Sequence, residues 1–469
     1  MKFTKAFAVV ISAMFLFTGC GNHPAESTAP MESQVEGTNV TESDEPIVIR
    51  LAVNKYMGYE VDKAIKEFNA LDNGYEIDKL IYDHENVYNS GNAIRSADMK
   101  LQMDIMNGDV VDMVADCAFE EISRYEILTE KGAFADLNPF LDGDTGTERS
   151  ELNAHILELH ETNGKLFQMP MYFNIETVMG LREDVGTKEN WTFDEMLTHW
   201  EAMPEGAVFS SNNTKDYVYM ALIRGNLSAF VDYENVICSF DSPEFIRMLE
   251  FCNSFPATPD AYLGYNPESM PIFLTECTFM GFYDYHYKLN SHYFQLPQIN
   301  YTFVGYPSED GTGSFIDTVG QRYSICATAS PEVQTGAWEF ISYMLSEDFQ
   351  YNRDELYKES SGEAYPDRGF PMNASVFERK ANELLIHEGE PNFISEGDGE
   401  HDIGYLTQVE YDRLVTFIDS LSRMNSHVDR TTWNIIEEEI GGLFAGERTA
   451  EEVAESIQAR VEILISERA

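Results

Sequence analysis

The sequence predicts an α/β fold of two or three domains, or of one large two-lobed unit. Three observations favour it: the chain has 469 residues, 43% of them are hydrophobic, and β-branched runs alternate with helical patterns. The length exceeds that of one small domain, and the hydrophobic content suffices for folded cores. Aromatic residues make up 13% of the chain, which excludes a wholly disordered acidic protein.

Strong acidity narrows the possible partners. The 31 Lys and Arg residues face 81 Asp and Glu residues, which gives a formal net charge of −50. Phosphate recognition needs clustered basic residues, so no nucleic-acid partner is expected. Electrostatic docking on anionic lipid is disfavoured for the same reason.

The N-terminus has the pattern of a secretion signal. Lys2 and Lys5 precede an apolar run at 6–17 that is too short to span a bilayer. The run ends at Thr18, Gly19 and Cys20, which resemble the lipobox of bacterial lipoproteins, although Phe17 stands where Leu is usual. We expect a signal peptide at 1–19 and lipidation of Cys20. The alternative is an ordinary cleaved signal with a chance cysteine.

The next segment has the composition of a tether. Residues 21–46 contain six acidic residues and no Lys, Arg or aromatic residue, so they cannot bury enough apolar surface to offset the entropy of ordering. We predict an acidic linker at 20–46 between the lipid anchor and a folded body.

Strands and helices alternate through the first part of the body. Strands are predicted at 47–53, 75–82 and 110–115, with helical patterns at 61–68 and 97–106 between them. Such alternation with short joins is typical of a parallel α/β unit.

Later helices carry clear start signals. Thr192 to Glu195 and Thr449 to Glu452 fit capping boxes, and Pro follows Ser at Ser242 and Ser330. Trp338 lies on a helical apolar stripe and is expected in the core.

The cysteine pattern supports neither a disulfide framework nor structural zinc. Five cysteines follow Cys20, none is in a CxxC pair, and five is an odd number. Apolar neighbours favour buried free thiols.

Catalytic signatures are missing. The chain has no GxSxG, GxxxxGK, GxGxxG or HExxH motif, so neither a cofactor nor a metal ion is predicted, and the protein is not expected to be an enzyme. A secreted carbohydrate-active hydrolase stays open as an alternative, because its carboxylate pair cannot be picked out among 81 acidic residues.

Several segments, taken in order, resemble the family 1 extracellular solute-binding proteins, the sugar-binding lipoproteins of bacterial ABC importers. They are residues 65–69, 104–113, 131–140, 164–170, 336–341 and 444–453. The resemblance, which is to maltose-binding-protein-like members, runs from about residue 47 to residue 467.

This resemblance implies a type II periplasmic-binding-protein-like fold, in which each lobe is a helix-flanked sheet. Lobe 1 would comprise residues 47–171 and 322–370, and lobe 2 residues 172–321 and 371–469. The chain would cross between the lobes three times, near Tyr172, near Gly320 and near Gly369 to Pro371. The ligand would lie in the cleft, and the lobes would close over it by hinge motion.

A sugar site needs aromatic platforms together with polar groups for the hydroxyls. Such groups belong at the ends of strands in open α/β sheets, at the crossings, and where similar proteins place an aromatic. Tyr283, Asp284 and Tyr285 are expected to end a strand at 279–282. The expected ligand-binding residues are Tyr56, Asp83, Asp116, Tyr172, Asn174, Tyr283, Asp284, Tyr285, Gly320, Gln321 and Trp433.

The resemblance also implies the partners. We expect a monomer that binds a carbohydrate, most simply an oligosaccharide, outside the cell. It would deliver this ligand to ABC transporter permease subunits while a lipid on Cys20 holds it to the membrane. The same fold could instead bind a non-sugar solute, such as a peptide or a polyamine.

Overall fold

The computed structural model describes most of the chain from Glu45 onward. The described residues are 45–54, 59–82, 91–119, 122–143, 146–210, 213–233, 235–257, 271–290, 300–308, 312–318, 320, 322–353, 368–396, 399–424 and 430–467.

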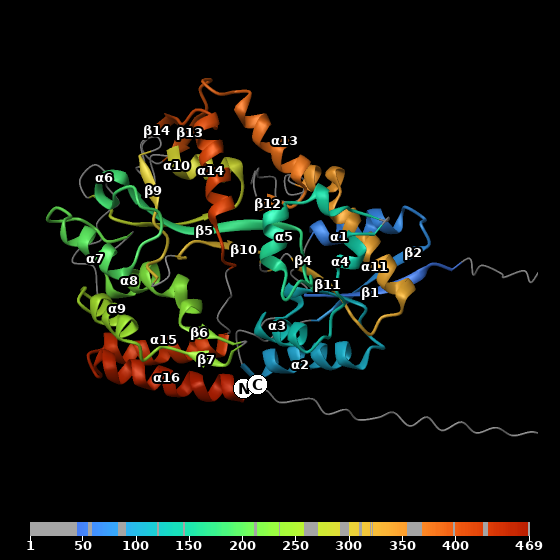
Figure 1. Ribbon diagram of the computed structural model, residues 1–469, viewed down its shortest axis with the longest axis horizontal. Coiled ribbons are helices and arrows are strands. Elements are labelled where there is room, and N and C mark those ends of the chain that lie inside the picture. Colours follow the sequence, from blue (N-terminus) through green and yellow to red (C-terminus); the bar gives the residue numbers. More distant parts are fainter. Residues whose placement is uncertain are drawn as a thin grey trace, which may run out of the picture. The chain divides into compact units, whose positions relative to one another are not determined.

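The first sheet has five strands in the order β2-β1-β3-β11-β4. They are β1 (Ile47–Val53), β2 (Tyr75–Ile81), β3 (Met113–Ala115), β4 (Met169–Pro170) and β11 (Arg322–Ile325). β1 runs parallel to β2 and β3, whereas β11 is antiparallel to β3 and β4. Helices α1 (Tyr59–Asn69), α2 (Gly91–Asn107), α3 (Ile122–Glu130) and α11 (Pro331–Leu345) accompany it (Figure 1).

The parallel strands at the start of the body confirm the predicted α/β unit. β1 and β2 pair along their full length, from Ile47 opposite Tyr75 to Val53 opposite Ile81. The third strand is shorter than predicted and begins at Met113. The carboxylate of Asp112, just before it, pairs with the Arg50 guanidinium, with a 2.7 Å Nη2–Oδ1 contact.

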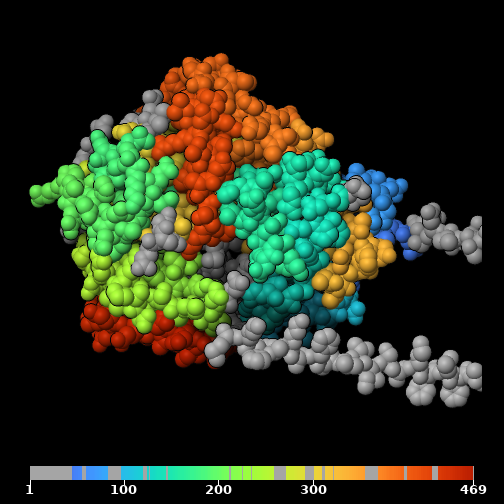
Figure 2. Space-filling view, viewed as in Figure 1, coloured from blue at the N-terminus to red at the C-terminus, as the bar shows by residue number. Residues whose placement is uncertain are grey.

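The second sheet is built around the long strand β5 (Tyr172–Leu181). β8 (Thr275–Phe279), β9 (Tyr301–Phe303), β10 (Phe315–Asp317) and β12 (Phe370–Pro371) all pair with it antiparallel. α15 (Arg430–Phe444) packs on α16 (Ala450–Ser466), which also contacts α9 (Pro243–Asn253). Figure 2 shows this C-terminal part, in dark red, at one edge of the surface beside yellow-green residues.

Residues after β8 depart from the prediction. They form helix α10 (Phe282–Asn290), and not the end of a strand. The buried positions Phe282, Tyr285 and Leu289 recur every three or four residues, which is the period of a helix. The Asp284 carboxylate accepts a hydrogen bond from the Met280 amide and pairs with Lys288 one turn later, which stabilises the first turn.

The helix start signals are confirmed. Thr192 and Thr449 form capping boxes with Glu195 and Glu452. Ser242 caps α9, whose first residue is Pro243, and Ser330 caps α11 in the same way. Each such cap contributes about 1 kcal/mol to helix stability.

One apolar cluster spans both sheets. It includes Ile49 of β1 and Phe303 of β9, and the fully buried Trp338 belongs to it, as predicted. At the start of β5 the Phe173 ring stacks on Phe370 at 5.3 Å, and Phe282 packs edge-on against Phe370 at 5.2 Å. The segments that lead from one sheet to the other are therefore part of a packed core.

The five cysteines that follow Cys20 are free thiols. Cys252, Cys277 and Cys326 are buried, as predicted, whereas Cys117 and Cys238 are only partly buried. Within the described part of the chain, no three His, Cys, Asp or Glu side chains gather that could hold a metal ion. None of the described helices is both long and apolar enough to cross a membrane.

Helix α16 allows a matched test of core packing. Ile457 is fully buried, whereas Ile463 on the same helix is 60% exposed. We expect Ile457→Ala to lower the free energy of unfolding by about 2–5 kcal/mol, because it leaves a cavity. Ile463→Ala should change it by no more than about 0.5 kcal/mol. Urea denaturation followed by fluorescence measures both, and equal losses would contradict this packing.

Candidate functional site at the crossing strands

A buried ion pair fixes the segment that leads from β10 to β11. Asp116, directly after β3, is fully buried, and its Oδ2 atom accepts hydrogen bonds from Arg322 Nε at 2.8 Å and from the Gly320 amide at 2.9 Å. The Arg322 guanidinium also donates to Gln168 Oε1 at 2.8 Å. Burial raises the pKa of the Asp116 carboxyl, and the charge of Arg322 opposes that rise.

This arrangement changes the expected role of Asp116. The residue was expected to bind a ligand in the cleft, but its side chain has no exposed surface and its carboxylate accepts protein donors. It therefore positions the crossing segment. The sequence could not show this, because Arg322 lies 206 residues further along the chain.

Gly320 is required by the backbone at this crossing. Its φ angle is +82°, a left-handed conformation that L side chains rarely adopt, although nothing lies within 4 Å of the place where a Cβ would stand. The conformation turns the Gly320 amide toward Asp116. Gly320 thus serves the crossing through its backbone.

The first crossing is held by an aromatic contact. Tyr172 is only 3% exposed, and the Arg353 guanidinium lies 3.5 Å from its ring centroid. Arg353 also donates to the carbonyl oxygen of Gly369 at 3.2 Å, next to the third crossing. Tyr172 therefore offers little surface to a ligand in this structure, and Arg353 links two crossings.

Asn174 lies two residues further along β5 and is half-buried. It stands opposite Asp317 of β10 in the sheet register. Its Oδ1 atom is buried and accepts no hydrogen bond from the described residues. The Asn174 side chain therefore keeps a buried polar atom that no described residue satisfies.

A histidine that was not predicted also contacts a crossing. His160, at the end of helix α5 (Ala154–His160), lies with Nε2 at 3.2 Å from the hydroxyl of Thr318. Burial, together with the charge of Arg322, lowers the pKa of His160 to about 3. The imidazole is therefore neutral at neutral pH, and its Nε2 atom can accept a hydrogen bond from the Thr318 hydroxyl.

The aromatic residues of α10 differ in their exposure. Tyr285 is fully buried, and its hydroxyl hydrogen-bonds to the Tyr301 hydroxyl at 3.0 Å, so its ring offers no platform to a ligand. Tyr283 is partly exposed and stacks on Tyr287 with ring centroids 6.4 Å apart. The Asp284 carboxylate binds the Met280 amide and Lys288 at the start of the helix.

Trp433 lies in the first turns of α15 and is partly exposed. One part of its indole packs against the apolar core of the second sheet's helices. Its neighbour Thr432 accepts a hydrogen bond from the Tyr233 hydroxyl at 2.9 Å, which joins the start of α15 to the segment after β6. Among the described residues, Trp433 and Tyr283 are thus the predicted aromatics that retain exposed surface.

Four of the predicted residues lie outside the described residues. They are Cys20, Tyr56, Asp83 and Gln321.

A sequence comparison matches residues 63–359, more than half of the chain, to the family described as bacterial extracellular solute-binding protein. None of the curated proteins matches the chain. Among solved structures, a periplasmic oligogalacturonide binding protein from Yersinia enterocolitica has 15% sequence identity and a TM-score of 0.53. The match covers 90% of this chain and 100% of that one.

Two further structures are similar. A de novo designed cysteine esterase has 14% identity and a TM-score of 0.53, with 91% of this chain and 99% of that chain covered. A cycloalternan-bound ABC substrate-binding protein from Listeria monocytogenes has 13% identity and a TM-score of 0.47, with 90% and 99% covered. The match to the periplasmic oligogalacturonide binding protein confirms the predicted two-lobed, periplasmic-binding-protein-like α/β fold.

Removing the charge of the buried Asp116 should destabilise the protein more than removing the charge of an exposed, paired carboxylate. Asp116→Asn leaves the Arg322 guanidinium buried without a counter-charge, and we expect it to lower the free energy of unfolding by about 3–5 kcal/mol. Glu438→Gln breaks an exposed pair with Arg460 and should cost no more than about 1 kcal/mol. Chemical denaturation measures both, and equal effects would refute the positioning role of Asp116.

Proposed function

The chain belongs to the bacterial extracellular solute-binding proteins, and from this premise we propose that it captures a carbohydrate, most simply an oligosaccharide, and delivers it to the permease of an ABC transporter. The family match over residues 63–359 carries the proposal. The Yersinia protein of similar fold, which binds oligogalacturonide, supports the choice of a sugar. The chain then acts by binding alone, without turnover.

The proposed movement is a closure of two lobes about the crossing strands. Each sheet draws its strands from one proposed lobe, residues 47–171 with 322–370 or residues 172–321 with 371–469, and only the short strand β12 straddles a boundary. The three connections lie at 170–172, 317–322 and 370–372. Closure would bring ligand-binding groups of both lobes onto one solute.

The proposed ligand-binding residues differ in how far their side chains are exposed to a ligand. Tyr283 and Trp433 supply aromatic surface for the apolar face of a sugar, and Asn174 supplies an amide oxygen for a hydroxyl. Tyr56, Asp83 and Gln321 complete the proposed set. Asp116, Tyr172 and Gly320 support the crossings instead.

A lipid anchor would keep the captured solute near the transporter. The lipobox-like Thr18 to Cys20, followed by an acidic linker, supports attachment of the mature protein through Cys20 to the outer side of the cell membrane. We propose that the protein acts there as a monomer.

Calorimetry against a panel of mono- and oligosaccharides tests the ligand class. We expect Trp433→Ala and Tyr283→Ala each to weaken the binding of a recognised sugar at least tenfold, about 1.4 kcal/mol, because each removes a stacking surface. Phe393→Ala removes a 63% exposed ring on β13 (Phe393–Glu396) and should leave affinity unchanged. Binding of a peptide or spermidine but no sugar would overturn the carbohydrate assignment.

The anchor is tested separately by Cys20→Ala. In cells fed a labelled fatty acid, the wild-type protein should take up label and enter the detergent phase. The variant should do neither, because it lacks the thiol that is acylated. A variant that is still labelled would show that Cys20 is not the lipidated residue.

A further inference from the structure

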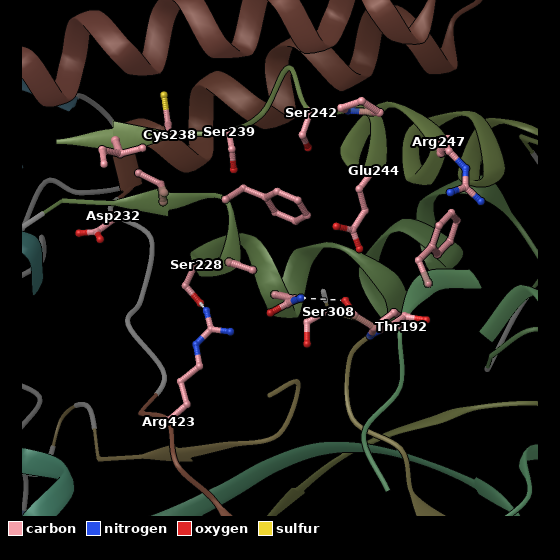
Figure 3. A pocket seen from close by; sticks show the side chains of 18 of the residues that line it. Thr192, Ser228, Asp232, Cys238, Ser239, Ser242, Glu244, Arg247, Ser308 and Arg423 are labelled. Atoms are coloured by element: carbon pink, nitrogen blue, oxygen red, sulfur yellow. Dashed lines mark hydrogen bonds between the residues drawn. The ribbon is translucent and has the colours of Figure 1, made fainter. Parts of the chain in front are cut away.

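A cavity of about 760 Å³ lies beside α9 and β7 (Ile237–Cys238), which both pack on α16. It is bordered by η3 (Arg224–Ala229), β6 (Val231–Asp232), β7 and the first turns of α7 (Phe193–Glu201) and α9 (Figure 3). None of the described residues among the proposed ligand-binding set lines it. Its volume falls within the range of about 300–1,000 Å³ that is typical of ligand sites.

Hydroxyl groups line this cavity from several elements. They belong to Thr192, Ser228, Ser239, Ser242 and Ser308. Figure 3 shows Ser239, Ser242 and Glu244 pointing into the space from one side, with Ser228 and Arg423 facing them, while the Cys238 thiol points away. The lining thus presents donors and acceptors from opposite walls.

The charges of the cavity are nearly balanced. Three carboxylates, of Asp194, Asp232 and Glu244, meet the two guanidinium groups of Arg247 and Arg423. Arg247 is paired with Asp194 at the rim. The whole chain has a net charge of −50, and the cavity lining carries too little positive charge to attract an anion strongly. The lining is also not purely acidic, as a polyamine would favour.

Two polar groups are already oriented. Arg423 donates to Ser228 Oγ at 3.2 Å and lies over the Phe315 ring at 4.9 Å. The Asn226 side chain is 1% exposed, and its nitrogen donates to the carbonyl oxygen of Pro307 at 3.1 Å. The Asn226 Oδ1 atom accepts no hydrogen bond from any described residue. A buried amide oxygen in this position is a polar group that a donor from outside the protein would satisfy.

The aromatic rings of the wall are not free to stack on a ligand. Phe230 is 6% exposed and packs edge-on against Phe245 at 4.9 Å. Phe193 is 2% exposed, and the Arg247 guanidinium lies over its ring at 5.4 Å. Recognition here would rest on hydrogen bonds.

From these features we propose that the cavity is a second ligand site, which binds an uncharged polyhydroxylated molecule, a sugar or polyol. The polar groups of the lining, with the unsatisfied Asn226 Oδ1 among them, suit a ligand that carries hydroxyl groups, and the near-neutral lining avoids the cost of desolvating an unpaired charge. This site does not depend on the carbohydrate capture proposed for the crossing strands.

Filling the cavity tests the proposal. No side-chain hydrogen bond joins Ser239 to another described residue, so Ser239→Trp should occupy the space without breaking one, and Ser239→Leu is a milder second variant. Saturation-transfer NMR and calorimetry with maltose, D-galactose and xylitol should show binding to the wild type. We expect the Trp variant to bind at least one of these probes tenfold more weakly or worse.

The matched control is Ser466→Trp at the exposed end of α16, which should bind as the wild type does. Circular dichroism shows whether each variant is folded. If Ser239→Trp does not fold, the binding measurements on Ser239→Leu decide. Trp433→Ala should leave the Ser239-dependent binding intact, so the two sites are told apart.

Three results would overturn the second site. They are unchanged affinity for every probe in the Ser239 variants, tighter binding of D-galacturonate or spermidine than of any neutral probe, and no binding of a neutral probe at all. Loss of sugar binding in Trp433→Ala alone, with the Ser239 variants unaffected, would refute the second site and leave the proposed capture function standing.

Discussion

The pairing of Asp116 with Arg322 is the constraint on which the arrangement of the crossings depends. A buried ion pair needs further hydrogen bonds to offset the loss of its hydration. Gln168 and the Gly320 amide supply two of them, and both lie on segments next to the passage between the sheets. The geometry of one crossing is thus set by the requirement to keep a buried carboxylate fully hydrogen-bonded.

Apolar packing complements this polar anchor at the other two crossings. The stacked rings of Phe173 and Phe370, and the Arg353 guanidinium over Tyr172, tie the first crossing to the third. The polar contacts at one connection and the aromatic contacts at the other two give these connecting segments different kinds of stiffness. A rotation between lobes that pivots near the aromatic contacts would disturb fewer directional bonds than one that pivots at Asp116.

How much the sequence could predict depends on how far apart in the chain the interacting residues lie. Caps at Thr192, Ser242 and Thr449 depend on residues within three positions, and the paired strands 47–53 and 75–81 are marked by their own β-branched patterns. The helix at 282–290 was missed because a dense run of aromatic residues suits either period. The roles of Asp116 and the cavity around Ser239 depend on partners far away in the chain, and composition gives no sign of them.

The burial of the free cysteines affects how readily oxidants react with the protein. Cys252, Cys277 and Cys326 are buried, and burial raises the pKa of each thiol, so little thiolate, the form that oxidants attack, is present. Cys117 and Cys238 are partly exposed, yet burial raises their pKa as well. The folded body therefore holds together without cross-links and resists oxidation at these thiols.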